Sequence, residues 1–289
     1  MTEVPRELAD EIPTFDSEAP KDHGLIDWTA FTSVRTAKTA LEIGTIILIA
    51  AAVFFGLEGI LRWTNEPEYV IPRPITVFQA LGTNFGLNYG HHLWVTLQEF
   101  LIGVTIGSTI GLLLAALITQ KPFVEKVITP YIIIMVTTPM LAFVPALRLS
   151  LVRGFSIWAI VVAVALASFP MVLINAATGF RRTDLAKIAL ARSYGASTLQ
   201  IFLRIRFPLA LPMIIVGLMV GSIFGLLTAI AGEMVSPSLQ GGLGRQLVFF
   251  AAQIQMPETG ATLVIVSSLG ICIWLIFYSI GKRWASWET

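Results

Sequence analysis

Long apolar stretches alternate with short polar ones along most of the chain. From residue 41 onward, six runs of eighteen or more residues consist mainly of apolar side chains. About 20 helical residues cross the hydrocarbon core of a bilayer, and backbone amides cannot stay unpaired there, so each run predicts a transmembrane helix. The six predicted spans are Leu41–Leu61, Phe100–Ile118, Val127–Leu147, Gly154–Phe180, Phe207–Gly232 and Thr259–Gly281.

Composition supports a membrane environment. The chain of 289 residues is 55% hydrophobic and 13% charged, whereas ordinary soluble domains are about 25% charged. The net charge of +1 creates no field that would favour a nucleic-acid partner, and the single cysteine, Cys272, cannot form an intrachain disulfide. We therefore expect an all-α polytopic membrane protein in contact with lipid, with six transmembrane helices and without nucleic acid.

Lysine and arginine predict the orientation of the spans. If the N-terminus is cytoplasmic, six spans return the C-terminus there, and 14 of the 19 basic residues lie on the cytoplasmic side. Residues 1–38 are predicted to be an acidic cytoplasmic tail that ends in a helix on the inner membrane surface. Eight Asp or Glu residues precede residue 35, so this stretch is not a signal peptide. Residues 39–289 are expected to form the membrane domain.

Small residues and prolines mark particular spans. Glycines repeat every four residues in the second and fifth spans, which lets a neighbouring backbone approach closely. This pattern fits either ordinary packing inside one subunit or surfaces along which helices slide. The third span carries three prolines and is predicted to be kinked or broken. These residues are Gly103, Gly107, Gly111, Gly217, Gly221, Gly225, Pro130, Pro139 and Pro145.

A polar passage, residues 184–206, interrupts the apolar pattern between the fourth and fifth spans. Asp184 can cap a first short helix, and Gly195 suits the left-handed position that ends one. Ser197 followed by Gln200 resembles a capping box that starts a second helix, with Leu199, Phe202, Leu203 and Ile205 on one side. The passage is interpreted as two short helices joined at a glycine, or alternatively as an amphipathic loop on the lipid surface.

The spacing of this passage resembles the signature of ABC importer permeases: Glu-Ala-Ala, three residues, a glycine, nine residues, an isoleucine, one residue and a final Leu-Pro pair. The matching residues here are Ala189-Leu190-Ala191, Gly195, Ile205 and Phe207-Pro208. Three further segments resemble the nitrate, sulfonate and taurine branch of that family. They are Ile71–Leu81, Val95–Ala115 and Gly232–Gly244. The family's first motif position is a glutamate that contacts the ATPase, and Ala189, which stands there in this chain, has no charge with which to make that contact.

The resemblance implies a type I ABC importer permease fold in a prokaryotic inner membrane. It also implies a second permease copy, with a homodimer favoured, two ATP-binding subunits and an extracytoplasmic solute-binding protein. Residues 184–206 would then be the coupling helices. Contact with the ATPase would fall on Ala189, Leu190, Ala191, Arg192, Gly195, Ala196, Ser197 and Gln200.

The chain itself lacks the G-x-x-x-x-G-K-[ST] phosphate loop and any catalytic or metal-ligating constellation. We therefore expect no enzymatic activity, cofactor or metal on this chain, with ATP and Mg²⁺ bound by the partner ATPase subunits.

Polar and helix-breaking residues inside the spans are candidates for a translocation pathway, because charges in a bilayer are costly. For Glu233, the alternatives are a carboxylate that faces the pathway and an ion pair with Arg148 or Arg153. Asn175 either lines a cavity or bonds to another helix. The complete set is Glu99, Pro139, Asn175, Gly225, Thr228 and Glu233.

Two other functions remain open from the sequence. A secondary transporter or channel would need no ATPase, but would need charged relays deep inside several spans. A membrane scaffold without transport is the other alternative. The transported solute is also open, with nitrate, bicarbonate, organosulfonates, aromatic carboxylates and pyrimidine precursors as candidates.

Overall fold

The structure, a computed structural model, describes residues 36–64, 67–68, 70–83, 85–139, 142–150, 156–235 and 241–284, and these form helices joined by turns and short loops. The chain divides into two units, residues 1–47 with Thr289 and residues 48–288. The predicted acidic tail lies outside the described residues.

In chain order the helices are α2 (Thr36–Thr64), α3 (Pro74–Gly82), α4 (His91–Gln120), α5 (Pro122–Thr137), α6 (Phe143–Ser150), α7 (Ser156–Arg181), α8 (Leu185–Ser193), α9 (Thr198–Ile201), α10 (Phe207–Met234), α11 (Leu243–Ala252) and α12 (Met256–Trp284). Two wider helical turns, η2 (Gly86–Gly90) and η4 (Phe202–Arg206), lead into α4 and α10.

Within the described residues, five helical segments are long and apolar enough to cross a membrane. They are Gly44–Thr64, Asn88–Gln120, Ile157–Arg181, Thr198–Met234 and Met256–Trp284. They correspond to five of the six predicted spans, and the all-α membrane fold is confirmed.

The remaining predicted span, Val127–Leu147, is not one helix. It is divided between α5 and α6, because Thr138 is extended before Pro139, as the residue preceding a proline usually is. With 16 residues, α5 is about 24 Å long, which is shorter than the hydrocarbon core.

Helices α4 and α10 pack onto α7 through their glycines. A Cβ added at Gly107 would lie 2.6 Å from the carbonyl oxygen of Ala165, and one at Gly221 would lie 3.0 Å from that of Ser168. Both distances are shorter than ordinary carbon–oxygen contacts, so the backbones meet with no room for a side chain. The two glycine series therefore serve packing inside one chain.

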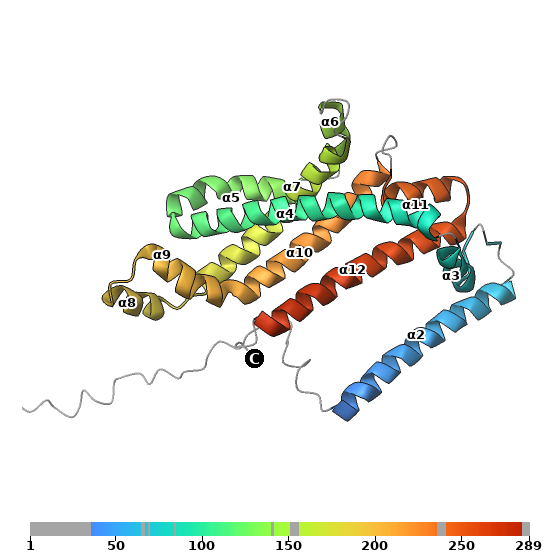
Figure 1. Ribbon diagram of the computed structural model, residues 1–289, viewed down its shortest axis with the longest axis horizontal. Helices are drawn as coiled ribbons and strands as arrows, with labels where there is room; N and C mark the ends of the chain where they lie inside the picture. Colours follow the sequence, from blue (N-terminus) through green and yellow to red (C-terminus); the bar gives the residue numbers. More distant parts are fainter. Residues whose placement is uncertain are drawn as a thin grey trace, which may run out of the picture. The chain divides into compact units, whose positions relative to one another are not determined.

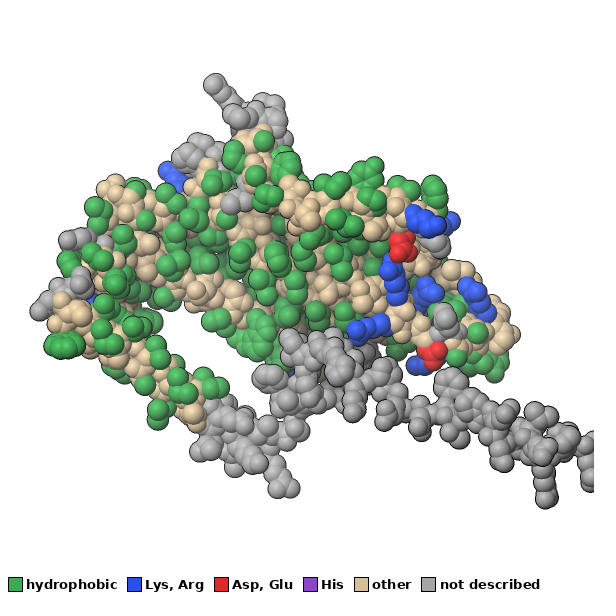
Figure 2. Space-filling view, turned by 180° about the vertical axis from the view of Figure 1, so that it is seen from behind, with side chains coloured by type: hydrophobic (Ala, Val, Ile, Leu, Met, Phe, Trp, Pro, Cys, Tyr) green, Lys and Arg blue, Asp and Glu red, His purple; other side chains and the backbone are tan. Residues whose placement is uncertain are grey.

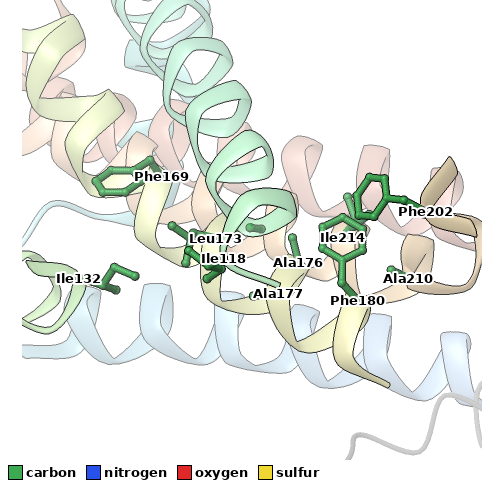
Figure 3. Close-up of a cluster of buried hydrophobic side chains, with 11 residues drawn as sticks. Ile118, Ile132, Phe169, Leu173, Ala176, Ala177, Phe180, Phe202, Ala210 and Ile214 are labelled. Atoms are coloured by element: carbon green, nitrogen blue, oxygen red, sulfur yellow. The ribbon is translucent and has the colours of Figure 1, made fainter. Parts of the chain in front are cut away.

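One end of this three-helix core carries α8 and α9, and the other end carries α3 and α11 (Figure 1). At the α8–α9 end, buried side chains from α4, α5, α7, η4 and α10 form a single apolar cluster, in which the rings of Phe180 and Phe202 are 5.0 Å apart (Figure 3). At the other end a second cluster joins α3, η2, α11 and α12 through Val77, Tyr89, Leu243, Phe250, Ala261 and Ile265.

The surface separates charge from apolar area. Figure 2 shows apolar side chains over most of the visible face, with Lys and Arg gathered mainly at the end that carries α8 and α9. Exposed basic side chains at that end include Arg181, Arg182, Lys187, Arg192 and Arg204. A broad apolar belt with charges at an end is the surface expected of a protein that spans a bilayer.

The tight glycine contact yields a stability prediction. Gly107→Ala places a methyl group against the Ala165 carbonyl and the Ser168 side chain, and should destabilise the protein by about 1–3 kcal/mol through overpacking. Gly270→Ala is the matched control, because nothing lies within 4 Å of a Cβ at that position in α12. Thermal unfolding of both variants in detergent measures the difference, and equal melting temperatures would contradict the packing described.

Candidate functional site

Residues 184–206, called the elbow below, fold as the sequence pattern predicts. The side chain of Asp184 accepts a hydrogen bond from the Ala186 N–H at 2.8 Å and caps α8. Gly195 has φ +79°, and the N–H groups of Gly195 and Ala196 donate to the carbonyls of Arg192 and Ala191. This is the paired hydrogen-bonding pattern of a Schellman motif, which ends a helix with a left-handed residue.

The second elbow helix begins with a complete capping box. The Ser197 N–H donates to Gln200 Oε1 at 2.8 Å, and the Gln200 N–H donates to Ser197 Oγ at 3.3 Å. The Asp184 cap, the Gly195 stop and the Ser197–Gln200 start predicted for the elbow are therefore confirmed. Because both helix ends that meet at Gly195 are satisfied within the elbow itself, the joint holds its angle without help from neighbouring elements.

The side chains predicted on one side of the second elbow helix are not all in the same environment. Ile201 and Phe202 are buried, whereas Leu199 and Leu203, expected beside Phe202, are 66% and 54% exposed. From Phe202 the helix continues as η4, a π-helical turn immediately before Pro208. Pro208 has no N–H to donate to the carbonyl four residues earlier, and a wider turn accommodates it while changing the helical register.

An exposed apolar surface results on the elbow. We call it the elbow patch, and it consists of Leu190, Tyr194, Leu199 and Leu203, each at least half exposed. Of the residues predicted to contact an ATPase, Ala189, Leu190, Arg192, Gly195, Ser197 and Gln200 are exposed, and Ala191 and Ala196 are half-buried. Sequence analysis missed Tyr194, which at 83% exposure is the most exposed of the patch side chains, although its position just before the αL glycine was a usable signal.

Two contacts tie the elbow end to the helical core. Phe202 packs on Phe180 at the end of α7, and the Arg181 guanidinium pairs with the Glu125 carboxylate at 2.8 Å. The ion pair joins the start of α5 to the end of α7. Since both of its members are partly exposed, it contributes little to stability by itself.

The opposite end holds a buried polar cluster, which we call the α11 latch: the side chains of Thr96 and Glu233 with the N–H groups of Leu243 and Gly244. Glu233 Oε2 accepts from the Gly244 N–H at 2.6 Å, and its Oε1 accepts from the Thr96 hydroxyl at 2.7 Å. Thr96 Oγ1 in turn accepts from the Leu243 N–H at 2.9 Å. A carboxylate and a hydroxyl thus satisfy the first turn of α11, whose own N-cap is Gly242.

The glycines around the latch make room for the carboxylate. Gly242 has φ +112°, and a Cβ at that position would lie within 2.8 Å of both carboxylate oxygens of Glu233. A Cβ at Gly244 would lie 2.9 Å from Glu233 Cβ and would overlap the carbonyl of Ile230. The Gly-Gly-x-Gly sequence therefore allows α11 to start directly against α10.

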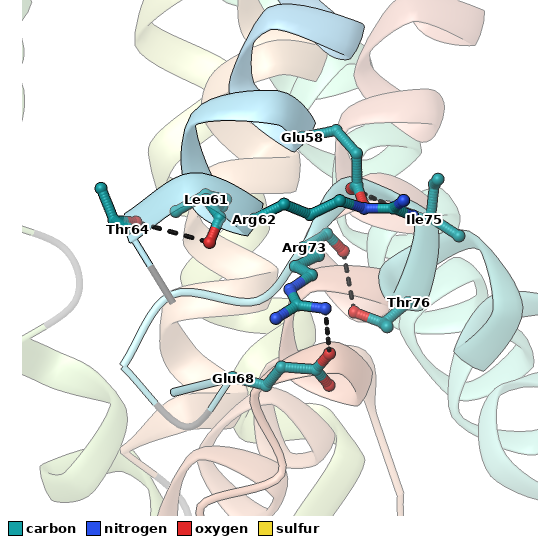
Figure 4. A network of polar contacts seen from close by, with 8 residues as sticks. All are labelled: Glu58, Leu61, Arg62, Thr64, Glu68, Arg73, Ile75 and Thr76. Carbon is teal, nitrogen blue, oxygen red and sulfur yellow. Dashed lines mark hydrogen bonds and ion pairs between the residues drawn. The ribbon is translucent and has the colours of Figure 1, made fainter. Parts of the chain in front are cut away.

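A second glutamate caps a second short helix. Glu58, near the end of α2, accepts from Arg62 Nε at 2.8 Å and from the Ile75 N–H in the first turn of α3 at 3.3 Å (Figure 4). Arg73 and Glu68 lie nearby, with a longer separation of 3.8 Å. The two short helices at this end, α3 and α11, are each held by a glutamate from a preceding long helix.

The six pathway candidates do not form one site. Glu99 and Glu233 are fully buried and interact with each other, and Gly225 is covered by Val104 of α4. The Asn175 amide donates to the Met171 carbonyl and the Thr228 hydroxyl to the Phe224 carbonyl, each within its own helix. Pro139 is exposed between α5 and α6. The predicted partners of Glu233, the side chains of Arg148 and Arg153, lie outside the described residues.

Comparison with known proteins identifies the family. The model of the "Binding-protein-dependent transport system inner membrane component" family matches residues 107–285. A probable ABC transporter permease protein of Haemophilus influenzae is 30% identical over 83% of this chain and 94% of its own length. The formylaminopyrimidine transport permease protein ThiX of Halalkalibacterium halodurans is 29% identical over 82% and 92%.

The match extends to the fold and to one branch of the family. A chain in an inward-facing structure of the MetNI methionine ABC transporter superposes with a TM-score of 0.61, at 18% identity, over 70% of this chain and 98% of that one. Relatives also include the nitrate import permease protein NrtB of Leptolyngbya laminosa, 29% identical over 67% of this chain and 71% of its own length. The putative aliphatic sulfonates transport permease protein SsuC of Escherichia coli is 27% identical over 88% and 93%. The chain therefore belongs to the binding-protein-dependent inner-membrane component family and is a permease subunit of an ABC importer, in the branch that includes the nitrate and sulfonate permeases.

Proposed function

We propose that this permease works as one of two copies in an ATP-driven importer, and that the elbow is the surface on which an ATP-binding subunit docks. The observation that carries the proposal is the elbow itself. It is a compact joint with both helix ends capped, and it presents the elbow patch beside exposed arginines at one end of the core. A segment that transmits force from a partner must be stiff and must present an apolar surface to which the partner binds.

The elbow is in direct contact with the core helices, so a force applied to the elbow acts on them. The Phe180–Phe202 contact and the buried cluster of Figure 3 join the elbow to α7, α10 and α4. Because the glycine contacts leave no gap between α4, α7 and α10, these helices respond together when the elbow is displaced. Closure of two ATP-bound ATPase subunits would draw two elbows together and change the access of a central pathway between the two copies.

The proposal assigns the remaining roles to partners. ATP and Mg²⁺ would be bound by the two ATPase subunits, and a solute-binding protein would deliver the solute at the end that carries α3 and α11. Arg192 and Gln200, both exposed, would supply polar contacts to the ATPase where Ala189 replaces the usual glutamate. The names of the relatives support a small polar solute such as nitrate, an organosulfonate or a pyrimidine precursor. Bicarbonate and aromatic carboxylates are also small polar solutes and belong to the same set of candidates.

The conformation of Gly195 gives a test of docking. Gly195→Val forces a β-branched residue to φ +79°, at a cost of about 1–2 kcal/mol that distorts the joint without touching the helical core. We expect normal membrane insertion, reduced co-purification with the ATPase and loss of ATP-dependent uptake in proteoliposomes. Uptake at the wild-type rate in this variant would contradict the proposal, and wild-type uptake that proceeds without ATP would favour a secondary transporter.

The elbow patch can also be removed without strain. Tyr194→Ala together with Leu199→Ala deletes two exposed side chains, so the melting temperature of the permease alone should stay unchanged. Affinity for the ATPase should fall by about tenfold or more, as is typical when an apolar anchor is lost from an interface. Binding measured between the purified permease and its ATPase checks this, and unchanged affinity would count against the patch as the docking surface.

The proposed orientation has its own test. After Cys272→Ser removes the only cysteine, Tyr194→Cys and Gln253→Cys place a thiol on an exposed site at either end of the core. With the elbow in the cytoplasm, a membrane-impermeant maleimide added to intact cells should label position 253 and leave position 194 unlabelled. Labelling of 194 from outside would reverse the orientation.

A further inference from the structure

A single helical rod connects the elbow to the α11 latch. Helix α9, η4 and α10 follow one another without a break from Thr198 to Met234, a segment of 37 residues. At 1.5 Å per residue the rod is about 55 Å long. Its first residues belong to the elbow, and Glu233 is its second-last residue.

At the end of the rod near Met234, buried hydrogen bonds hold the first turn of α11. Glu233 and Thr96 are both fully buried, and together they take the N–H groups of Leu243 and Gly244. These amides are in the first turn of α11 and have no acceptor within their own helix. Separating α11 from the rod would leave two donors and a carboxylate buried without partners, which is far more costly than breaking exposed bonds.

The attachment is steric as well as polar. Because the backbone at Gly244 lies against the Ile230 carbonyl, α11 cannot shift toward α10 without a clash. Thr96 comes from α4, which is itself packed against α7 through Gly103, Gly107 and Gly111. The first turn of α11 is therefore fixed to two helices of the core at once.

We propose that Glu233 and Thr96 are positioning residues that make α11 move as one body with the far end of the rod, so that displacement of the elbow is delivered to α11. The inference rests on the proposed function of the elbow and goes beyond it, because it assigns a moving part to the opposite end of the molecule. Helix α11 has an exposed apolar face, with Val248 and Phe249 at 40% and 50% exposure, that moves with it. Helix α3 is different, since Glu58, which caps it, belongs to α2 and not to the rod.

Thr96 is the better residue for a test, because its substitution removes one oxygen and leaves the shape. Thr96→Val deletes the hydroxyl that joins Glu233 to the Leu243 N–H, and Thr96→Ser keeps it. Thr105→Val on the same helix is the matched control, because the Thr105 hydroxyl is exposed and bonds only to the Leu101 carbonyl of its own helix. Glu58→Gln weakens the other helix-capping carboxylate and controls for general loosening at this end.

The experiment uses the complete transporter in proteoliposomes, with Cys272→Ser and spin labels at the exposed positions Leu227 on α10 and Val248 on α11. Labelled copies are diluted with unlabelled ones so that each complex carries a single labelled copy. The distance between the labels is measured without nucleotide and after trapping with ATP, and the number of solute molecules moved per ATP is measured on the same preparations.

In the wild type we expect the label distance to be the same in both states. In Thr96→Val the distribution of distances between the two labels should broaden. The number of solute molecules moved per ATP should fall severalfold while ATP hydrolysis continues. Leaving the buried Leu243 N–H without an acceptor raises the detached population by about tenfold or more. Thr96→Ser should restore both the narrow distance distribution and the solute-to-ATP ratio. Thr105→Val and Glu58→Gln should leave the solute-to-ATP ratio unchanged.

A wild-type distance that changes with nucleotide would overturn the inference, because α11 would then move independently of the rod. So would a Thr96→Val complex with normal solute-to-ATP ratio, or one that merely melts earlier with the ratio intact. The proposed function fails in a different way, through a wild-type complex whose uptake does not depend on ATP.

Discussion

The contact on which the structure depends is backbone against backbone, where α4 and α10 meet α7 at their glycines. In a bilayer no hydrophobic force drives helices together, so close packing of this kind is a main source of association. At Gly107 and Gly221 no side chain separates the helices, and the approach distances leave no freedom for one helix to move sideways alone. The three helices therefore behave as one core, and the parts attached to its two ends move with it.

The two ends are built by different chemistry. At the elbow, the caps are local: Asp184, Ser197 and Gln200 satisfy amides no more than three residues away. At the α11 latch, the caps come from other helices, with Thr96 bonding to an amide 147 residues later in the chain. A locally capped joint keeps its shape when it binds a partner and separates from it. A helix capped from other elements takes its position from them, which suits a part that must follow the core.

This difference also explains how much the sequence could predict. The Asp184 cap, the left-handed Gly195 and the Ser197–Gln200 box were predicted because each depends on neighbours in sequence. Apolar length predicted six spans, five of which are single long helices, and the four-residue glycine repeats predicted close packing. The exact break in the third span depends on which of three prolines interrupts the helix, and composition alone does not decide among them. The prediction that Phe202 shares a side with Leu199 and Leu203 was wrong, since Phe202 is buried and both leucines are exposed, and the wider turn at η4 changes the helical period from Phe202 onward.

The role of Glu233 could not be derived from its own surroundings in the sequence. The sequence left a pathway-facing carboxylate and an arginine partner as alternatives, and it did not predict that the carboxylate accepts bonds from a threonine and a backbone amide on other elements. One signal was available: a Gly-Gly-x-Gly start offers α11 no capping side chain, so the cap has to come from elsewhere in the fold. Glu58 and α3 follow the same principle, since the N-cap residue of α3 makes no side-chain cap of its own.

The most direct test of the account asks what touches the elbow in the assembled transporter. A photoreactive amino acid at Tyr194, the most exposed side chain of the elbow patch, can be activated in the complete complex in its membrane. The account predicts a covalent adduct with the ATP-binding subunit, in a yield that changes between the nucleotide-free and ATP-bound states. Adducts with lipid alone, in both states, would contradict it.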